Sequence, residues 1–315
     1  MLFAALIYVI EEQKITPVND SNKLLSSRIY SGILEPQSYL ILNYDPLRED
    51  ITSYIEGNNL NVSVYVENLR DGASMGIHER SAYPPASMSK LPLAILIMKK
   101  VENEELTFDQ KIPILDEDRN DSSGDLYEIP RTELSIRELL DAMLRESDNT
   151  AFNVLLRNAN SNDFTTLLDK YYGYFHEAGE NDADDSYYVT PIGFYNVFSS
   201  LYLSTVLQPQ DSEYILQLLT NTSFDIRKTA NLPENVTVAH KYGIRYRKDE
   251  KYFHDCGIMY IENLRIFYCI MTKDMEQKQA IETTAMILNK IYSYTTKTRE
   301  ELDDYKEGFV EGSKE

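Results

Sequence analysis

The chain has 315 residues, 43% of them hydrophobic, so it can bury a full core in one large domain or in two interleaved lobes. Its 51 acidic and 31 basic residues give a formal net charge of -20, which repels nucleic acids and anionic membrane surfaces. We therefore expect a folded globular protein that does not bind nucleic acid. A basic stretch at residues 241–251 departs locally from this acidity.

The N-terminus opens with an apolar run, residues 2–10, which two glutamates follow directly. These nine residues are too few to span a bilayer, and the run lacks a basic segment and a small-residue cleavage site. We interpret it as a signal or membrane-anchor remnant, or equally as an ordinary strand or helix. The first interpretation predicts an exported protein, whether periplasmic, extracellular or membrane-anchored. Residues 1–46 are read as an N-terminal extension.

Apolar residues that alternate with polar ones indicate strands near both ends of the chain. The first strand covers residues 60–68, and the turn Asp71-Gly72 joins it to a second strand at residues 73–78. Helical spacing precedes this hairpin at residues 47–55. Towards the C-terminus we predict three antiparallel strands at residues 236–246, 255–261 and 264–271. A long helix at residues 275–294 and a charged tail at residues 298–315 follow them.

The middle third of the chain is predicted to be helical. Residues 89–105 are apolar on every face, which is typical of a helix buried at the centre of a protein. Pro92 fits such a helix only within the first turn, so the helix begins close to Ser87. A polar stretch at residues 116–125 is read as a loop. Further helices are predicted at residues 134–144, 150–157, 193–206 and 211–219.

The two cysteines, Cys256 and Cys269, flank a predicted hairpin and can face each other across two strands. We expect two free thiols, because a direct cross-strand disulfide is usually strained; a disulfide is the alternative. The four histidines show no metal-ligand spacing. We therefore expect no metal and no cofactor.

Three short motifs follow one another along the chain, and the first is Ser87-Met88-Ser89-Lys90. On a helix Ser87 and Lys90 share a face and can form a hydrogen bond. Lys90 can then take the proton of Ser87 if its pKa falls by about 3 units from about 10.4. Burial or a second ammonium can cause this fall, and Lys241 is the candidate neighbour. Alone, the motif also fits the polar face of a surface helix.

The second motif, Ser147-Asp148-Asn149, stands directly before the predicted helix at residues 150–157. An N-cap explains Asp148 on its own. The whole tripeptide adds a hydroxyl that can pass a proton to a leaving nitrogen. It also adds a carboxamide that can hold both a lysine and a substrate amide.

The third motif, Lys241-Tyr242-Gly243, lies within the predicted strand at residues 236–246. A lysine here can attract a substrate carboxylate, and Gly243 permits close approach of another segment. The backbone N–H groups of Ile244 and Ser87 can form an oxyanion hole. Without the other two motifs, an ordinary charged edge strand explains these residues equally well.

Together the motifs resemble those of class A β-lactamases and penicillin-binding serine acyltransferases, in which Ser-x-x-Lys, Ser-Asp-Asn and Lys-[Thr/Ser]-Gly occur in this order. The resemblance covers about residues 50–297. It implies an α/β fold of the α+β type, with an antiparallel sheet flanked by terminal helices and an inserted all-helical lobe. The implied catalytic domain spans residues 47–297, with the sheet lobe at 47–86 and 231–297 and the helical lobe at 87–230.

The resemblance also implies roles for the motif residues. It implies Ser87 as the acylated nucleophile, Lys90 as its base and Ser147 as the proton relay. It also implies that Asn149 contacts the substrate and the lysine, and that Lys241 anchors the substrate carboxylate. The implied partner is a small β-lactam or a peptidoglycan stem peptide, and we expect a monomer.

Two departures from the family pattern concern substrate binding and hydrolysis. Tyr242 stands where the family has Thr or Ser, so a small hydroxyl is lost and bulk is added. The family's Glu-x-x-Leu-Asn segment has no match between Asn149 and Thr190. Glu177 and Glu180 fall in the corresponding loop and are candidates for positioning the hydrolytic water, although a solvated acidic loop explains them more simply.

These departures leave three functions open. The preferred one is an active-site serine hydrolase that opens β-lactam or D-Ala-D-Ala-type amides, with acylation competent and hydrolysis slow. The second is a penicillin-binding D,D-peptidase or transpeptidase, which uses Ser87 in the same way but turns over antibiotics poorly. The third is a non-catalytic module that senses cell-wall or β-lactam compounds, which Tyr242 and an N-terminal anchor favour. The lifetime of an adduct on Ser87 separates the hydrolase from the other two functions.

Overall fold

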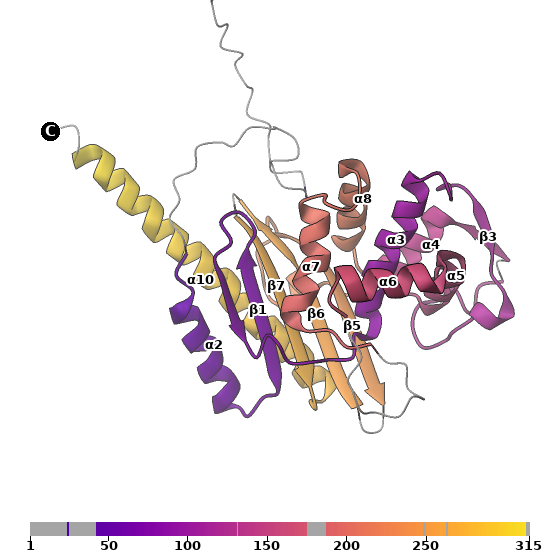
Figure 1. The fold of residues 1–315 in the computed structure, drawn as a ribbon. Helices are drawn as coiled ribbons and strands as arrows, with labels where there is room; N and C mark the ends of the chain where they lie inside the picture. The colour runs from indigo at the N-terminus through magenta and orange to yellow at the C-terminus, as the bar shows by residue number, and fades with distance from the viewer. Residues whose placement is uncertain are drawn as a thin grey trace, which may run out of the picture.

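A five-stranded antiparallel sheet forms the frame of the protein (Figure 1). The computed structural model describes residue 24 and residues 42–130, 132–174, 187–247, 250–262 and 264–312. The strand order is β2-β1-β7-β6-β5, so the N-terminal hairpin pairs with the last strand of the C-terminal meander, and β5 lies at an edge. The strands are β1 (Val62–Asn68), β2 (Ser74–Ile77), β5 (Thr237–Arg247), β6 (Glu250–Ile261) and β7 (Leu264–Lys273).

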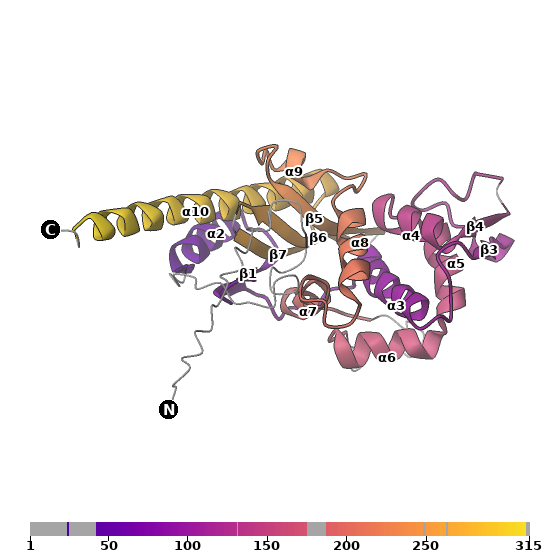
Figure 2. The ribbon, with the colours of Figure 1, turned by 90° about the horizontal axis from the view of Figure 1, so that it is seen from above.

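Helices cover both faces of this sheet (Figure 2). Helices α2 (Asp45–Gly57) and α10 (Gln277–Gly312) pack side by side on one face, and α7 (Pro191–Tyr202) packs on the other. The inner strands β6 and β7 are therefore buried along almost their whole length. This double burial explains their nearly continuous apolar sequence, which differs from the alternation expected of a sheet with one wet face.

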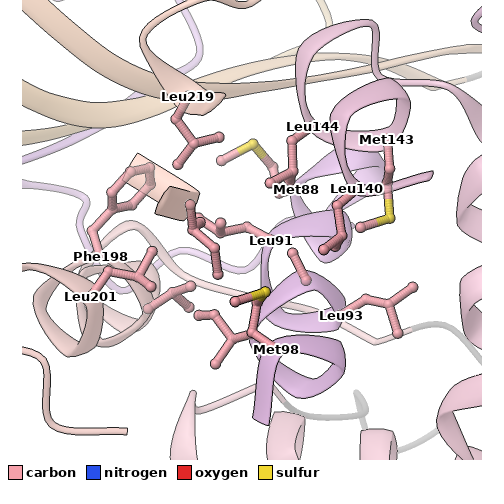
Figure 3. Close-up of a cluster of buried hydrophobic side chains, with 14 of the residues drawn as sticks. Met88, Leu91, Leu93, Met98, Leu140, Met143, Leu144, Phe198, Leu201 and Leu219 are labelled. Carbon is pink, nitrogen blue, oxygen red and sulfur yellow. The ribbon is translucent and has the colours of Figure 1, made fainter. Parts of the chain in front are cut away.

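The helical lobe is built around α3 (Lys90–Glu102), whose apolar residues are buried on every side. A short 3-10 turn, η2 (Ala86–Ser89), leads into it, so the predicted helix start near Ser87 is confirmed and Pro92 lies in the first turn. Leu91, Leu93 and Met98 pack against side chains of α4, α7 and α8 (Figure 3). The surrounding helices are α4 (Ile136–Arg145), α5 (Asn149–Ala159), α6 (Ser161–Tyr171) and α8 (Pro209–Leu219).

Several elements, most of them short, were not predicted. They are α6, the one-turn helix α9 (Ile226–Thr229), the 3-10 turn η3 (Asp116–Asp118) and a two-stranded sheet of β3 (Lys111–Pro113) and β4 (Glu133–Ser135). A three-residue strand has too few positions to show a period of two, so its sequence resembles a loop. Strand β6 also begins earlier than predicted, because residues 250–254 continue the pairing with β5.

The expectation of two free thiols was wrong. Cys256 and Cys269 form a disulfide, and the described residues contain no free cysteine. The two residues are direct partners in the register of β6 and β7, with their Cα atoms 4.0 Å apart. At this separation across neighbouring strands the two sulfur atoms are within bonding reach.

Helix α10 continues well beyond its predicted end near residue 294 and runs to Gly312. Its 36 residues correspond to about 54 Å at 1.5 Å per residue. The C-terminal part extends past the edge of the sheet (Figures 1 and 2). Among the described residues, no helix combines the length and apolar character needed to cross a membrane. The apolar run at residues 2–10 lies outside the described residues.

Candidate active site

Ser87 lies on η2, at the junction between the edge strand β5 and the start of α3. The residue before it, Ala86, has a φ of 47°, in the left-handed region that residues other than glycine rarely adopt. Just upstream, Nε2 of the buried His254 lies 3.0 Å from the carbonyl oxygen of Pro84. Unfavourable backbone conformations like that of Ala86 persist where the surrounding structure holds them, and they cluster at functional sites.

Gly243 allows β5 to pack directly against the η2 turn that carries Ser87. A Cβ at this position would lie 3.0 Å from Cγ of Met88, 3.1 Å from the carbonyl oxygen of Pro85 and 3.3 Å from the backbone N of Ser87. Any side chain would therefore push β5 away from η2. The third motif thus reaches the first through a glycine, as the sequence predicted for close approach.

Lys90 connects the first motif with the second. Its Nζ lies 3.1 Å from Oγ of Ser87, 3.1 Å from Oγ of Ser147 and 2.6 Å from Oδ1 of Asn149, and it also contacts the backbone oxygen of Ser147. The residue is 2% exposed. An ammonium has three hydrogens for these four oxygens, whereas a neutral amine has a lone pair that can accept a proton.

The environment of Lys90 favours the neutral amine. Burial lowers the pKa of Lys90 to about 7, and the negative charge of Asp148 opposes this shift. Near neutral pH an uncharged Lys90 beside the hydroxyl of Ser87 is therefore well populated.

Lys241 approaches the same hydroxyl of Ser147 from the other side. Its Nζ lies 3.0 Å from Oγ of Ser147 and 2.9 Å from the backbone oxygen of Tyr242. The side chain is fully buried, and burial together with the nearby charge of Lys90 lowers the pKa of Lys241 well below its usual value. In the described part of the chain, neither lysine forms an ion pair with a carboxylate.

The second motif turns at Ser147, which is buried and has a φ of 54°. The N-cap interpretation of Asp148 is confirmed, because its Oδ1 accepts a hydrogen bond of 2.7 Å from the N–H of Ala151. Its Oδ2 accepts a second bond of 3.0 Å from the N–H of Leu126. The cap fixes the start of α5, and this holds Ser147 and Asn149 towards Lys90.

A loop that the sequence analysis left without a role closes over this motif. Nδ2 of Asn149 donates a bond of 2.6 Å to Oγ of Ser122, and its backbone N–H donates to the carbonyl oxygen of Ser123 at 3.0 Å. Gly124 has a φ of 81°, and a Cβ there would lie 2.0 Å from Oδ2 of Asp148. The Ser-Ser-Gly sequence signals a turn, but nothing in it indicates that the turn packs on Asn149.

Tyr242 and Ile244 differ in their exposure along the edge strand. The Tyr242 ring is half-buried against Phe224, with 5.2 Å between ring centroids, and its hydroxyl lies 3.5 Å from Oγ of Ser223. Ile244 is 37% exposed. The oxyanion role of the N–H groups of Ser87 and Ile244 stays a prediction. The role of Glu177 and Glu180 in positioning the hydrolytic water also stays a prediction, because both residues lie outside the described residues.

Within the residues that the structure describes, no cluster of three or more His, Cys, Asp or Glu side chains can hold a metal ion.

Comparison with known sequences identifies the family. Residues 46–295 match the model of the beta-lactamase enzyme family. The chain belongs to this family. Beta-lactamase VEB-1 of Pseudomonas aeruginosa is 24% identical to it over 271 residues, which cover 80% of this chain and 89% of that protein. A beta-lactamase of Phocaeicola vulgatus is 24% identical over 263 residues, or 76% and 81% of the two chains.

Solved structures of similar proteins confirm the predicted fold class. PBP-A superposes with a TM-score of 0.73 at 18% identity, covering 82% of this chain and 99% of PBP-A. The TLA-1 extended-spectrum beta-lactamase superposes with a TM-score of 0.71 at 21% identity, covering 81% and 99%. At these identities the likeness concerns the fold, a mixed structure of helices and an antiparallel sheet.

Proposed function

We propose that this protein is an active-site serine hydrolase that opens β-lactam or D-Ala-D-Ala-type amides through an acyl-enzyme on Ser87. One observation carries the proposal: Nζ of Lys90 lies 3.1 Å from both Ser87 Oγ and Ser147 Oγ, in surroundings that lower its pKa to about 7. An amine whose pKa is lowered towards 7 and that is hydrogen-bonded to a serine fits the requirements of a general base.

In the proposed acylation, Oγ of Ser87 bonds to the substrate carbonyl carbon while its proton moves to Nζ of Lys90. The carbonyl oxygen becomes an oxyanion, for which the N–H groups of Ser87 and Ile244 are the proposed donors. When the carbonyl re-forms, the C–N bond breaks and the nitrogen takes a proton from Oγ of Ser147. Lys90 then returns its proton to Ser147, so the products are an ester on Ser87 and a neutral amine.

The second lysine has a supporting part in this scheme. Lys241 donates to Oγ of Ser147 at 3.0 Å, which fixes the hydroxyl between the two amines. Asn149 holds Lys90 through Oδ1 at 2.6 Å. Positioning of this kind places the relay before the substrate arrives.

A labelling experiment tests the proposal. A fluorescent penicillin should label the wild-type protein covalently, and Ser87→Ala should abolish the label. Ser89→Ala is the matched control, because Oγ of Ser89 donates to the backbone oxygen of Ala86 at 3.0 Å. This control should label like the wild type. A folded wild-type protein that stays unlabelled would contradict the proposal.

Hydrolysis of the ester is proposed to be slow, because the sequence lacks the family's Glu-x-x-Leu-Asn segment. Glu177 and Glu180 are the proposed candidates for holding the water. Time-resolved intact mass should show slower adduct loss in Glu177→Gln or Glu180→Gln. Unchanged lifetimes in both variants would remove both glutamates from the mechanism.

A penicillin-binding D,D-peptidase or transpeptidase is the second candidate. The likeness to PBP-A favours it, and a PBP-A mutant has been solved as an acyl-enzyme complex with penicillin G (TM-score 0.68, 20% identity, 79% of this chain and 96% of that one). An adduct lost within minutes supports the hydrolase, whereas one that lasts hours supports the peptidase or a sensing module. Because peptidoglycan lies outside the cytoplasm, we also propose that the protein is exported, which cell fractionation can test.

A further inference from the structure

The chain reaches the Ser87 turn through two consecutive prolines, Pro84 and Pro85. Because proline has no backbone N–H, backbone hydrogen bonds can hold these two residues only through their carbonyl oxygens. The next residue, Ala86, has a φ of 47°, a conformation that persists where its surroundings hold it. The carbonyl contacts of this segment therefore help to fix the position of Ser87.

Hydrogen bonds on both sides of Pro84 hold the ends of this segment. Tyr83 forms a β-bridge with Val189, in which the N–H of each residue donates to the carbonyl oxygen of the other at 2.9 Å. The carbonyl oxygens of Pro85 and Ala86 accept hydrogen bonds of 2.9 and 3.0 Å from residues of η2 itself. The carbonyl oxygen of Pro84 is then the one that needs a partner from elsewhere in the fold.

His254 on β6 is this partner. Its Nε2 lies 3.0 Å from the carbonyl oxygen of Pro84, across 170 residues of sequence, and the side chain is fully buried. A carbonyl oxygen can only accept, so Nε2 carries a hydrogen and donates it. Burial lowers the pKa of His254 to about 4, so at neutral pH the ring is uncharged and has a single N–H. That N–H is directed at Pro84.

The surroundings of His254 fix the direction of this bond. The ring lies edge-on to that of Tyr83, with 5.3 Å between centroids, and 5.9 Å from that of Tyr252. The hydroxyl of Tyr83 is in turn 2.8 Å from Oγ of Ser63 on β1. In a close-packed interior a ring held in this way keeps one orientation.

The register of the sheet joins this bond to the third motif. His254 lies directly opposite Gly243 in the pairing of β5 with β6. A Cβ at Gly243 would lie 3.1 Å from the carbonyl oxygen of Pro85, so the glycine gives the turn room to approach the sheet. The histidine beside it supplies the hydrogen bond that holds the turn there.

From these contacts we infer that His254 is a positioning residue for the acylation of Ser87. By holding Pro84 it keeps the turn in the place where Oγ of Ser87 lies 3.1 Å from Nζ of Lys90. The inference rests on the proposed acylation and adds a residue that none of the three motifs contains. His254 acts through the backbone and takes no part in the bond changes, but small displacements of a reacting atom are costly in rate.

Replacement by Met or Gln separates the hydrogen bond from the packing. The two side chains have the same length, and only Gln has an N–H that can take the place of Nε2. His254→Met should lower the limiting rate of Ser87 acylation by benzylpenicillin about tenfold, with an unchanged half-saturating concentration. His254→Gln should recover most of this rate. Rapid-quench intact mass measures both variants, and either an undiminished rate in His254→Met or equal losses in the two would overturn the inference.

Two further variants guard against a simple loss of stability. His254→Asn is too short to reach Pro84 and should behave like His254→Met, which keeps the test open if the Met variant does not fold. Thr272→Val is the matched control, because Oγ1 of the buried Thr272 donates to the carbonyl oxygen of Phe253 at 2.9 Å. It also removes one buried bond to a backbone oxygen but should acylate like the wild type. A similar slowing in Thr272→Val would overturn the specific role of His254.

Hydrogen–deuterium exchange tests the inference without the reaction. Amides of residues 86–89 should exchange faster in His254→Met than in the wild type or in His254→Gln, because the turn has lost its bond to β6. A wild-type protein that benzylpenicillin does not acylate would overturn the proposed function, and the exchange data would still decide whether His254 holds the turn. Normal acylation of the wild type with unchanged exchange and rate in His254→Met would overturn this inference alone.

Discussion

The two faces of the β5–β6 pair differ in whether their buried ionisable groups have a partner of opposite charge. On the face towards Ser87 lie Lys241 and His254, and both have a lowered pKa because they are buried. On the other face His240 and Asp255 form a buried pair, with 2.8 Å between Nδ1 and Oδ2. Tyr268 donates to the second oxygen of the same carboxylate at 2.6 Å.

The paired groups on one face stabilise the fold, whereas the bases without an ion-pair partner on the other face are suited to proton transfer. The buried pair of His240 and Asp255, with Tyr268 on the second carboxylate oxygen, links β5, β6 and β7 through hydrogen bonds. A buried base without an ion-pair partner has a lowered pKa, so it gives up its proton more readily than it does in water. The face of β5 that meets η2 has the second character, and Lys90 on α3 extends it to Ser87.

Among the variants considered, Lys90→Gln should have the largest effect on the acylation rate of Ser87. Removing the proposed base should slow acylation of Ser87 by about a thousandfold, since general-base catalysis contributes roughly 10²–10⁴. Lys90→Arg should be slowed as much, because a guanidinium keeps its proton. Stopped-flow measurement of penicillin adduct formation checks both variants. A rate within tenfold of wild type in either variant would speak against Lys90 as the base.

On the face that carries the His240–Asp255 pair, Asp255→Asn should have the largest effect on stability. It removes a fully buried charge from His240 and Tyr268 and should lower the free energy of unfolding by about 3 kcal/mol. Asp141→Asn is the control, because it breaks the exposed pair with Arg145 and should cost only about 0.5 kcal/mol. Urea denaturation measures both. Equal effects would remove the distinction between paired burial and surface pairing.

His254 predicts a pH dependence of stability on the unpaired side. Burial lowers its pKa to about 4, while Nε2 faces the Pro84 carbonyl and Nδ1 has no partner. The unfolded chain, with a pKa of about 6.5, binds the proton more readily, so stability is full above that pH and falls as the pH drops towards 4.

The expected loss from this one group between pH 7 and pH 5 is about 2 kcal/mol. Carboxylates contribute to the same pH range, so the measurement is the difference between wild type and His254→Gln in urea denaturation at several pH values. Parallel curves for the two proteins would show that His254 does not titrate in this way.

The sequence predicts the frame of this fold well because its long elements have clear periodicity. The strand at residues 60–68 alternates, and the apolar residues 89–105 indicate a buried helix that Pro92 limits to a start near Ser87. Short elements escape this reasoning, as β3 and α9 show. The hairpin placed the two cysteines opposite each other, as β6 and β7 confirm, and the disulfide was mispredicted because a direct cross-strand bond was expected to be strained.

The same limit applies to the site. The order of the three motifs identifies Ser87, Lys90, Ser147 and Lys241, but their contacts depend on tertiary packing. Ser122 reaches Asn149 through a loop whose shape depends on Gly124 beside Asp148. His254 meets Pro84 across 170 residues of sequence, which no local pattern encodes.

The pH dependence of Ser87 acylation tests the central claim most directly. If Lys90 is the base and its pKa is about 7, the rate of adduct formation should rise about tenfold per pH unit below 7 and level off above it. Measurement with benzylpenicillin methyl ester avoids a titrating group on the substrate. A rate that is flat from pH 5 to 9, or that keeps rising towards pH 10, would contradict the account.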